Sequence, residues 1–209
     1  EPVSVKDVLV EMKDTSELLI DLAYSAVLHQ SDAVAQEVLA LEEKMGVLQM
    51  RARMSLLMAA RNPRDTERLA PVLGVGAGAE KIGDAAGDIA KIVLEEMGLP
   101  DAMRAAIPEA VEMLVRGTVD PSSEYAGRTL GDVNLESQTG VRALAVRRGS
   151  EWILNPGPNT TVEADDVVIL RGPDQSIGNV YETYTGEGYE PPTVDEPSVA
   201  DLDRAVDSI

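Results

Sequence analysis

The feature that most constrains the fold is a regular series of apolar residues in the first third of the chain. They follow one another at steps of 4, 3, 4, 3 and 4 positions: Val34, Val38, Leu41, Met45, Leu48 and Ala52. This spacing predicts one apolar stripe along a long helix that packs against other helices at coiled-coil-like angles. Ser31 or Asp32 is predicted to cap this helix. Asn62-Pro63 should end it, because the residue before a proline avoids the helical region.

The same kind of pattern continues through the first 117 residues. A similar stripe covers residues 5–26, and a third helix is expected from about residue 65 to 97, with Pro71 and glycines 74, 76 and 78 as points where it would bend. A fourth, shorter helix is expected from Pro100 to about Val115. Residues 1–117 are therefore predicted to form an antiparallel helical bundle with short connections.

After Gly117 the pattern changes to short elements. A short helix is expected at 129–133, strands at 141–147 and 151–154 around the turn Gly149-Ser150, and a strand at 167–170 that is buried on both faces. Residues 118–181 then form a small α+β domain, which makes the fold class α+β. Residues 182–209 read as an acidic tail, in which Ser198 could cap one short terminal helix.

Charge restricts the classes of partner. The chain has 37 acidic against 18 basic residues and a net charge of −19, which argues against nucleic acid and against docking by charge on anionic membranes. Such self-repulsion is typical of halophilic proteins, so a salt-rich cytoplasm is expected. The chain has no cysteine, no apolar run of 18 residues and no signal peptide, which predicts a soluble, cytosolic protein.

One acidic stripe stands out on the third predicted helix. Glu80, Asp84 and Asp88 lie four positions apart, where like charges repel. In one interpretation the stripe is a solvent-exposed face of the helix, and lysines 81 and 91 reduce the repulsion between its carboxylates. In the other, Glu17 and Asp21 of the first helix join it, and these five carboxylates bind a divalent or ferric cation. The small residues 83, 86 and 87 would let the helices approach closely.

Three further motifs have two interpretations each. GVGAGA (74–79) matches a dinucleotide fingerprint but lacks the surrounding strands, so a loosened helix is favoured and no NAD is expected. His29, the only histidine, is expected at the surface. Arg147 and Arg148 could bind an anion beside Trp152, or could be ordinary strand residues paired with acids.

Residues 127–173 resemble the TrkA-C domain, the C-terminal half of the RCK regulators of potassium transport. The matching residues are Gly127, Thr129, Leu130, Leu135, Thr139, Gly140, Arg147, Trp152, Pro156, Thr160, Asp166 and Gly172. The resemblance implies homodimerisation through this domain. It also implies a cleft near Arg147, Asn155 and Pro156 for a small anionic ligand such as a cyclic dinucleotide.

The helical half resembles PhoU, a phosphate-signalling family whose helices carry (E/D)xxxD metal motifs, here Glu17 to Asp21 and Glu80 to Asp84. A full PhoU has two three-helix repeats, and this chain has room for one. RCK proteins have a nucleotide-binding domain before TrkA-C, and here a helical bundle occupies that place.

Together these features predict a non-enzymatic, cytosolic regulatory subunit that senses a ligand and controls a membrane cation transporter or channel, for potassium or a divalent cation. It would lie at the membrane only through that partner. The alternative is a PhoU-type phosphate-signalling adaptor that binds a transporter or kinase.

Overall fold

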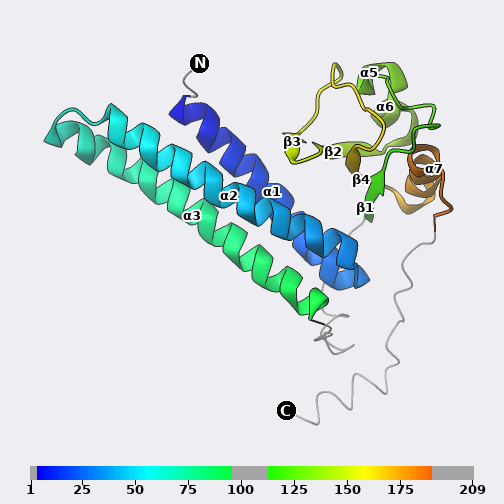
Figure 1. Ribbon diagram of the computed structural model, residues 1–209, viewed down its shortest axis with the longest axis horizontal. Coiled ribbons are helices and arrows are strands. Elements are labelled where there is room, and N and C mark those ends of the chain that lie inside the picture. Colours follow the sequence, from blue (N-terminus) through cyan, green and yellow to red (C-terminus); the bar gives the residue numbers. More distant parts are fainter. Residues whose placement is uncertain (1–3, 96–112, 190–209) are drawn as a thin grey trace, which may run out of the picture. The chain divides into compact units, whose positions relative to one another are not determined.

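The computed structural model describes residues 4–95 and 113–189 of the chain (Figure 1). The chain divides into two compact units on either side of the Leu99–Pro100 bond. We call them the helical unit and the sheet unit.

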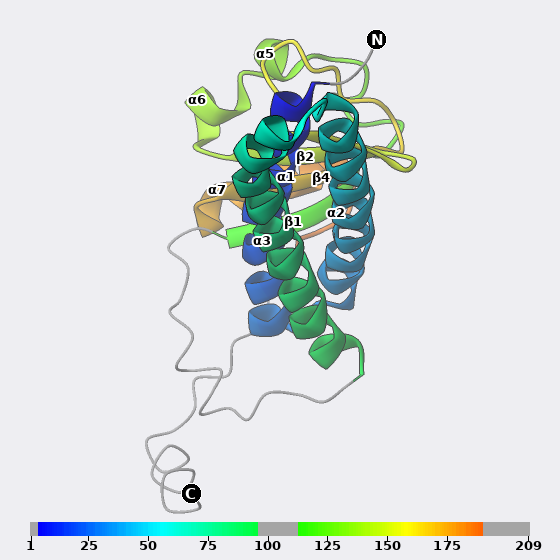
Figure 2. The same cartoon turned by 90° about the vertical axis from the view of Figure 1, so that its left-hand side faces the viewer.

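The helical unit is a bundle of three long helices that lie side by side (Figure 2). They are α1 (Val5–His29), α2 (Asp32–Ala59) and α3 (Pro63–Leu94). Each helix has an N-cap whose side chain accepts a backbone N–H bond: Ser4, Ser31 and Asn62, respectively. The predicted bundle and the end of the second helix before Pro63 are thus confirmed, and α3 continues through Pro71 as one helix.

The core of the bundle is the predicted stripe. All six of its residues on α2 are buried, as are Met12, Leu19 and Leu22 of α1, and the two helices are in contact. Burying one such side chain stabilises the fold by roughly 1.5–3 kcal/mol, so the stripe supplies much of the helical unit's stability.

Small residues on α3 bring it close to both neighbours, as the sequence predicted. A Cβ atom at Gly83 would lie 3.3 Å from Met45 Cγ of α2 and 3.6 Å from Leu19 Cδ1 of α1. A Cβ atom at Gly87 would overlap the Glu42 carboxylate of α2. The glycines within the acidic stripe therefore serve helix packing.

The sheet unit is a four-stranded antiparallel sheet in the order β1-β4-β2-β3. Its elements are β1 (Met113–Thr118), α5 (Leu130–Val133), α6 (Leu135–Thr139), β2 (Arg142–Arg148), β3 (Glu151–Leu154), β4 (Val167–Gly172) and α7 (Asp174–Thr185). The predicted hairpin, the short helix at 129–133 and the buried strand are confirmed, and the α+β fold class with them. The central strand β4 is almost wholly buried because it pairs on both edges and packs against α7.

The predicted helix from Pro100 to Val115 was wrong at its end. Residues 100–112 lie outside the described residues, but Met113–Thr118 is strand β1. It pairs with the whole of β4, from Met113 opposite Gly172 to Thr118 opposite Val167. Pairing with a distant strand overrides the local apolar spacing, and the sheet therefore begins before the predicted boundary at residue 117.

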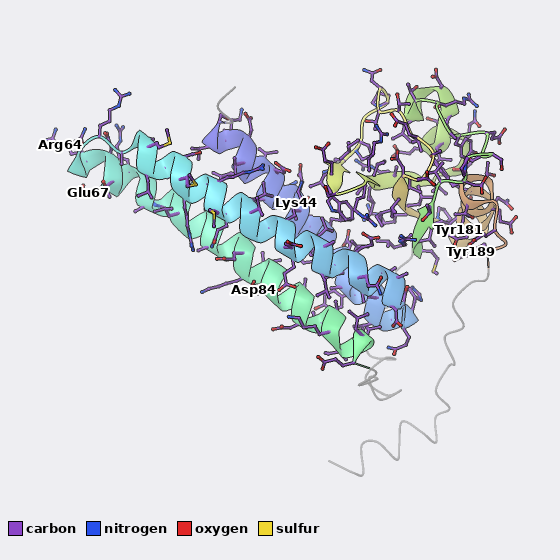
Figure 3. All side chains as sticks on the ribbon, viewed as in Figure 1. Lys44, Arg64, Glu67, Asp84, Tyr181 and Tyr189 are labelled. Carbon is purple, nitrogen blue, oxygen red and sulfur yellow. The ribbon has the colours of Figure 1, made fainter. Side chains whose placement is uncertain are left out.

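The predicted end of this domain near residue 181 was also too early. Helix α7 continues to Thr185, and the Tyr181 and Tyr189 rings pack with their centroids 5.6 Å apart. Both tyrosines are labelled in Figure 3. The sheet unit thus includes residues that were predicted to belong to the acidic tail, while the predicted terminal helix after Ser198 lies outside the described residues.

Gly117 allows α7 to pack on β1. A Cβ atom at this position would lie 2.8 Å from Thr185 Cγ2 and 3.4 Å from a ring carbon of Tyr181. Since 2.8 Å is shorter than van der Waals contact, a larger residue at this position would force Thr185 or α7 to shift.

Candidate functional site

The predicted metal ligands are spread along the outside of the helical unit. Glu17, Asp21, Asp84 and Asp88 have exposed side chains, and Glu80 is half-buried. Figure 3 labels Asp84 on α3. Within the described residues, no group of three or more acidic or histidine side chains is close enough to hold a metal ion. The structure therefore does not bring the five carboxylates together, and their role as metal ligands stays a prediction.

Basic side chains neutralise most of these carboxylates. Lys13 Nζ lies 2.8 Å from Glu17 Oε2, Lys91 Nζ lies 3.1 Å from Asp88 Oδ1, and Arg53 Nη2 lies 3.7 Å from Glu80 Oε2. The hydrogen bond to Asp88 is the main reason that the pKa of Lys91 is raised, and Glu42 adds to it. This arrangement fits the first of our two interpretations, an acidic, solvent-exposed helix surface on which nearby lysines and an arginine reduce the charge repulsion.

The other two motifs of the helical unit both lie within helices. GVGAGA (74–79) lies inside α3, and a dinucleotide fingerprint would need it between a strand and a helix. His29 is half-buried near the end of α1, which corrects the expected surface position. Burial lowers its pKa, and its Nδ1 atom has no hydrogen-bond partner among the described residues.

The sheet unit contains an open cavity of about 420 Å³ between its short helices and the loop after β3. We call it the α6 cavity. Polar and charged lining residues come from three places: Asn134, Glu136 and Ser137 from the α5–α6 segment, Arg142 from β2, and Asn155 from the loop. Apolar surface is provided by Leu130, Leu135, Val141, Pro156 and Pro158. Polar and apolar surface thus contribute about equally to the lining of the cavity.

The loop wall of the α6 cavity is fixed by backbone hydrogen bonds. The Gly131 N–H donates to the Pro158 carbonyl at 2.7 Å, and the Asn155 N–H donates to the Leu144 carbonyl at 3.0 Å. Asn155 itself has a left-handed backbone with φ of 46°. A Cβ atom at Gly131 would lie 2.8 Å from the Pro158 oxygen, so glycine is needed for this contact.

Two of the three predicted ligand-binding residues, Asn155 and Pro156, line the α6 cavity, and Arg147 does not. The Arg147 guanidinium lies over the Trp152 ring, 5.7 Å from its centroid, and donates to the Gly149 carbonyl at 2.9 Å. Arg142 lines the cavity instead, at the other end of β2, about 16 Å away along the strand. It makes no hydrogen bond or ion pair with any residue that the structure describes.

Sequence reasoning missed Arg142 because a lone arginine at the start of a strand has no local signature. The available signal was the predicted hairpin. Its two strands are antiparallel, so the start of β2, where Arg142 lies, is at the same end of the hairpin as Asn155, the first residue after β3.

Arg148 holds the segment after the cavity loop in place. Its Nε and Nη2 atoms donate to the two carboxylate oxygens of Asp166 at 2.9 and 2.8 Å, and Nη2 also donates to the Thr161 carbonyl. Asp166 is only 1% exposed, and it accepts a further bond from the Glu163 N–H. The hydrogen bond to Asp166 raises the Arg148 pKa. Arg148 is therefore an anchor of the loop rather than an open anion site.

No helix within residues 4–95 or 113–189 has the length and apolarity to cross a bilayer.

Comparison with known families gives a match for each unit. Residues 9–93 match the family model of the PhoU domain, and residues 114–184 match that of the TrkA-C domain. The two matches account for the helical bundle and the sheet, respectively.

Curated relatives share only part of the chain. The Ktr system potassium uptake protein A of Vibrio alginolyticus is 39% identical over 57 residues, which are 27% of this chain and 26% of that protein. The K(+)/H(+) antiporter subunit KhtT of Bacillus subtilis is 28% identical over 72 residues, 34% of this chain and 44% of that protein. This chain thus matches less than half the length of either relative.

Among solved structures, the RCK_C domain dimer of S. agalactiae BusR in complex with c-di-AMP is 27% identical. The match covers 34% of this chain and 92% of that one, with a TM-score of 0.32.

Proposed function

Because this chain joins a PhoU domain at residues 9–93 to a TrkA-C domain at residues 114–184, we propose that it is a regulatory subunit of cation transport. Potassium is the first candidate ion, and a divalent cation is the second. The observation that carries this proposal is that two curated relatives are named for potassium transport. One is a potassium uptake protein and the other is a K(+)/H(+) antiporter subunit. The role is non-enzymatic and cytoplasmic, and the protein reaches the membrane only through its transporter.

The α6 cavity is the proposed sensing site. Its free cation, Arg142, and the amides of Asn134 and Asn155 suit a phosphate or carboxylate, and Leu135 and Pro156 suit an apolar part of the same ligand. The proposed ligand is therefore a small anion with an apolar moiety, and a cyclic dinucleotide is the first to test. A ligand that binds one arrangement of a TrkA-C homodimer better than another would shift the population of states that the transporter experiences.

A metal role for Glu17, Asp21, Glu80, Asp84 and Asp88 is a separate proposal. Binding would require ion pairs such as Lys91–Asp88 to open, so the affinity would be modest. Calorimetric titration of magnesium, manganese, zinc and iron at molar KCl tests it with wild type and Glu80→Gln/Asp84→Asn. Saturable binding that the double variant lacks supports the site, and no saturable binding rejects it.

Deletion of the gene in its own cell tests the function. We expect altered intracellular potassium when external potassium is changed, restored by wild type and by Arg147→Ala but not by Arg142→Ala. These two variants remove the same charge from opposite ends of β2, so each controls for the other. Normal potassium in the deletion strain, or full restoration by Arg142→Ala, would contradict the proposal.

The runner-up is a PhoU-type phosphate-signalling adaptor, which the match over residues 9–93 favours. In that case the deletion strain would show altered phosphate uptake at constant potassium, and Arg142→Ala would restore it as well as wild type does.

A further inference from the structure

Helix α2 has a second apolar stripe, which faces solvent. Its members follow one another at steps of 3, 4 and 3 positions: Val47, Met50, Met54 and Leu57. Between 47% and 74% of each is exposed, whereas Ala52 and Leu56, which lie between them in the sequence, are 3% exposed. Met58, beside the stripe, is 82% exposed. Single exposed apolar residues are common, but four in a heptad series on one helix indicate an interaction surface.

The end of this stripe lies near the connection between α2 and α3. Helices α1 and α2 are antiparallel and are joined by only two residues, so the start of α1 lies beside the last turns of α2. Figure 1 shows the α2–α3 hairpin extending beyond the start of α1.

The same section has the opposite charge to the rest of the chain. Residues 44–64 contain five basic residues and no acid, in a protein with a net charge of −19. Arg51 and Arg53 flank the stripe on its two sides, at positions that form salt bridges in helix pairs. Arg53 lies 3.7 Å from Glu80, but Arg51 and Arg61 form no ion pair with residues that the structure describes. Figure 3 labels Arg64 at the end of this hairpin.

We propose that the exposed stripe of α2 docks an acidic amphipathic helix of a partner protein. The heptad spacing fits apolar residues at the a and d positions of a helix, and the arginines fit glutamate or aspartate at its flanking positions. A second copy fits less well, because pairing this stripe with itself would bring Arg51 and Arg53 of both copies together near Ala52. A lipid surface also fits less well, because amphipathic helices that bind bilayers present a wider apolar face than one a/d seam.

Binding of two matched peptides to the full chain tests this proposal. Both are 21-residue helices with leucine at a and d positions; one has glutamate and the other lysine at the flanking positions. By fluorescence anisotropy at 0.15 M KCl, we expect the acidic peptide to bind at least tenfold more tightly than the basic one. Met54→Ser/Leu57→Ser should weaken it at least tenfold, and Val10→Ser, an exposed apolar position on α1, less than twofold. All variants change exposed residues, and circular dichroism verifies their folding.

Charge reversal provides an independent check. Arg51→Glu should reduce the preference for the acidic peptide at least threefold while leaving helix content unchanged. Equal binding of both peptides, or binding that Met54→Ser/Leu57→Ser does not change, would overturn the proposal. Binding to phosphatidylglycerol vesicles without binding to the acidic peptide would overturn it in favour of a lipid surface. Self-association lost in Met54→Ser/Leu57→Ser would overturn it in favour of a second copy. This test uses neither a transported ion nor a small ligand, so its result is independent of the proposed function.

Discussion

The helical unit and the sheet unit use charged residues in different ways. In the helical unit most carboxylates lie on the outside, and several pair with flexible lysines, as in Lys13–Glu17, where both side chains are more than 60% exposed. Glu37 on α2, 4% exposed, is the exception among the described residues of this unit. In the sheet unit, Asp166 is buried and Arg148 binds both of its oxygens. Exposed pairs contribute little stability, whereas breaking a buried pair leaves an uncompensated charge. A regular acidic pattern is therefore a weaker sign of a demanding structural or functional role than one buried acid.

The largest expected effect comes from breaking the buried pair. Arg148→Met should lower the free energy of unfolding of the sheet unit by about 3 kcal/mol, because Asp166 stays buried without its partner. Trp152, the only tryptophan, lies in β3, so its fluorescence during urea unfolding reports on this unit alone. Lys13→Met in the helical unit is the matched control and should leave the curve unchanged. If both variants lowered the free energy of unfolding equally, the two units would not differ in how much their ion pairs contribute to stability.

The next effect tests close packing in the sheet unit. Gly117→Ala should cost about 1–3 kcal/mol, because the new Cβ atom meets Thr185 and Tyr181 on α7. The same fluorescence measurement applies. Gly157→Ala, where a Cβ atom meets nothing within 4 Å, should change stability little. If Gly117→Ala proves neutral, α7 does not pack on β1 as described.

In the helical unit, a glycine substitution should have the opposite sign. Gly46→Ala should stabilise by about 0.5–1 kcal/mol, since glycine is a poor helix former and a Cβ atom there meets nothing within 4 Å. Urea unfolding followed by circular dichroism at 222 nm measures the change. Gly83→Ala, against Met45 and Leu19, should give no such gain. A loss at Gly46 would mean that this part of α2 is covered.

The smallest expected effect is a pH dependence of the helical unit. Burial lowers the pKa of His29 from its usual 6.5, so the unfolded chain binds the proton more tightly. The stabilisation from neutral, buried His29 is complete above about pH 6.5 and decreases as the pH falls toward the folded-state pKa. Between pH 7 and 5, wild type should lose more stability than His29→Gln by urea unfolding at 222 nm. Parallel pH profiles would show that His29 is solvated.

Local patterns predicted most of the secondary structure. The stripe from Val34 to Ala52, the cap at Ser31 and the turn at Gly149-Ser150 depend on neighbours within a few residues, and each is confirmed. Strand β1 was missed because it depends on pairing with β4, more than fifty residues later. Its apolar residues fit a helix equally well until that partner is known.

The candidate site was also predicted only in part. Asn155 and Pro156 directly follow a predicted strand, and Pro156 is one of the residues that carry the TrkA-C resemblance, so the sequence indicated this loop. Arg147 was predicted from the TrkA-C resemblance and from its position beside Trp152, but its guanidinium lies over that ring and does not line the cavity. In an antiparallel hairpin the start of β2 lies beside the end of β3, so the predicted hairpin already placed Arg142, and not Arg147, near the loop after β3.

The central claim is that the α6 cavity is a site for a small anion and that Arg142 provides its charge. Calorimetric titration of cyclic di-AMP into wild type, Arg142→Ala and Arg147→Ala tests this most directly. The account predicts saturable binding to wild type, an affinity at least tenfold lower for Arg142→Ala, because a charge-assisted hydrogen bond is worth about 1.5–3 kcal/mol, and less than a twofold change for Arg147→Ala. No saturable binding to wild type, or a larger loss for Arg147→Ala than for Arg142→Ala, would contradict it.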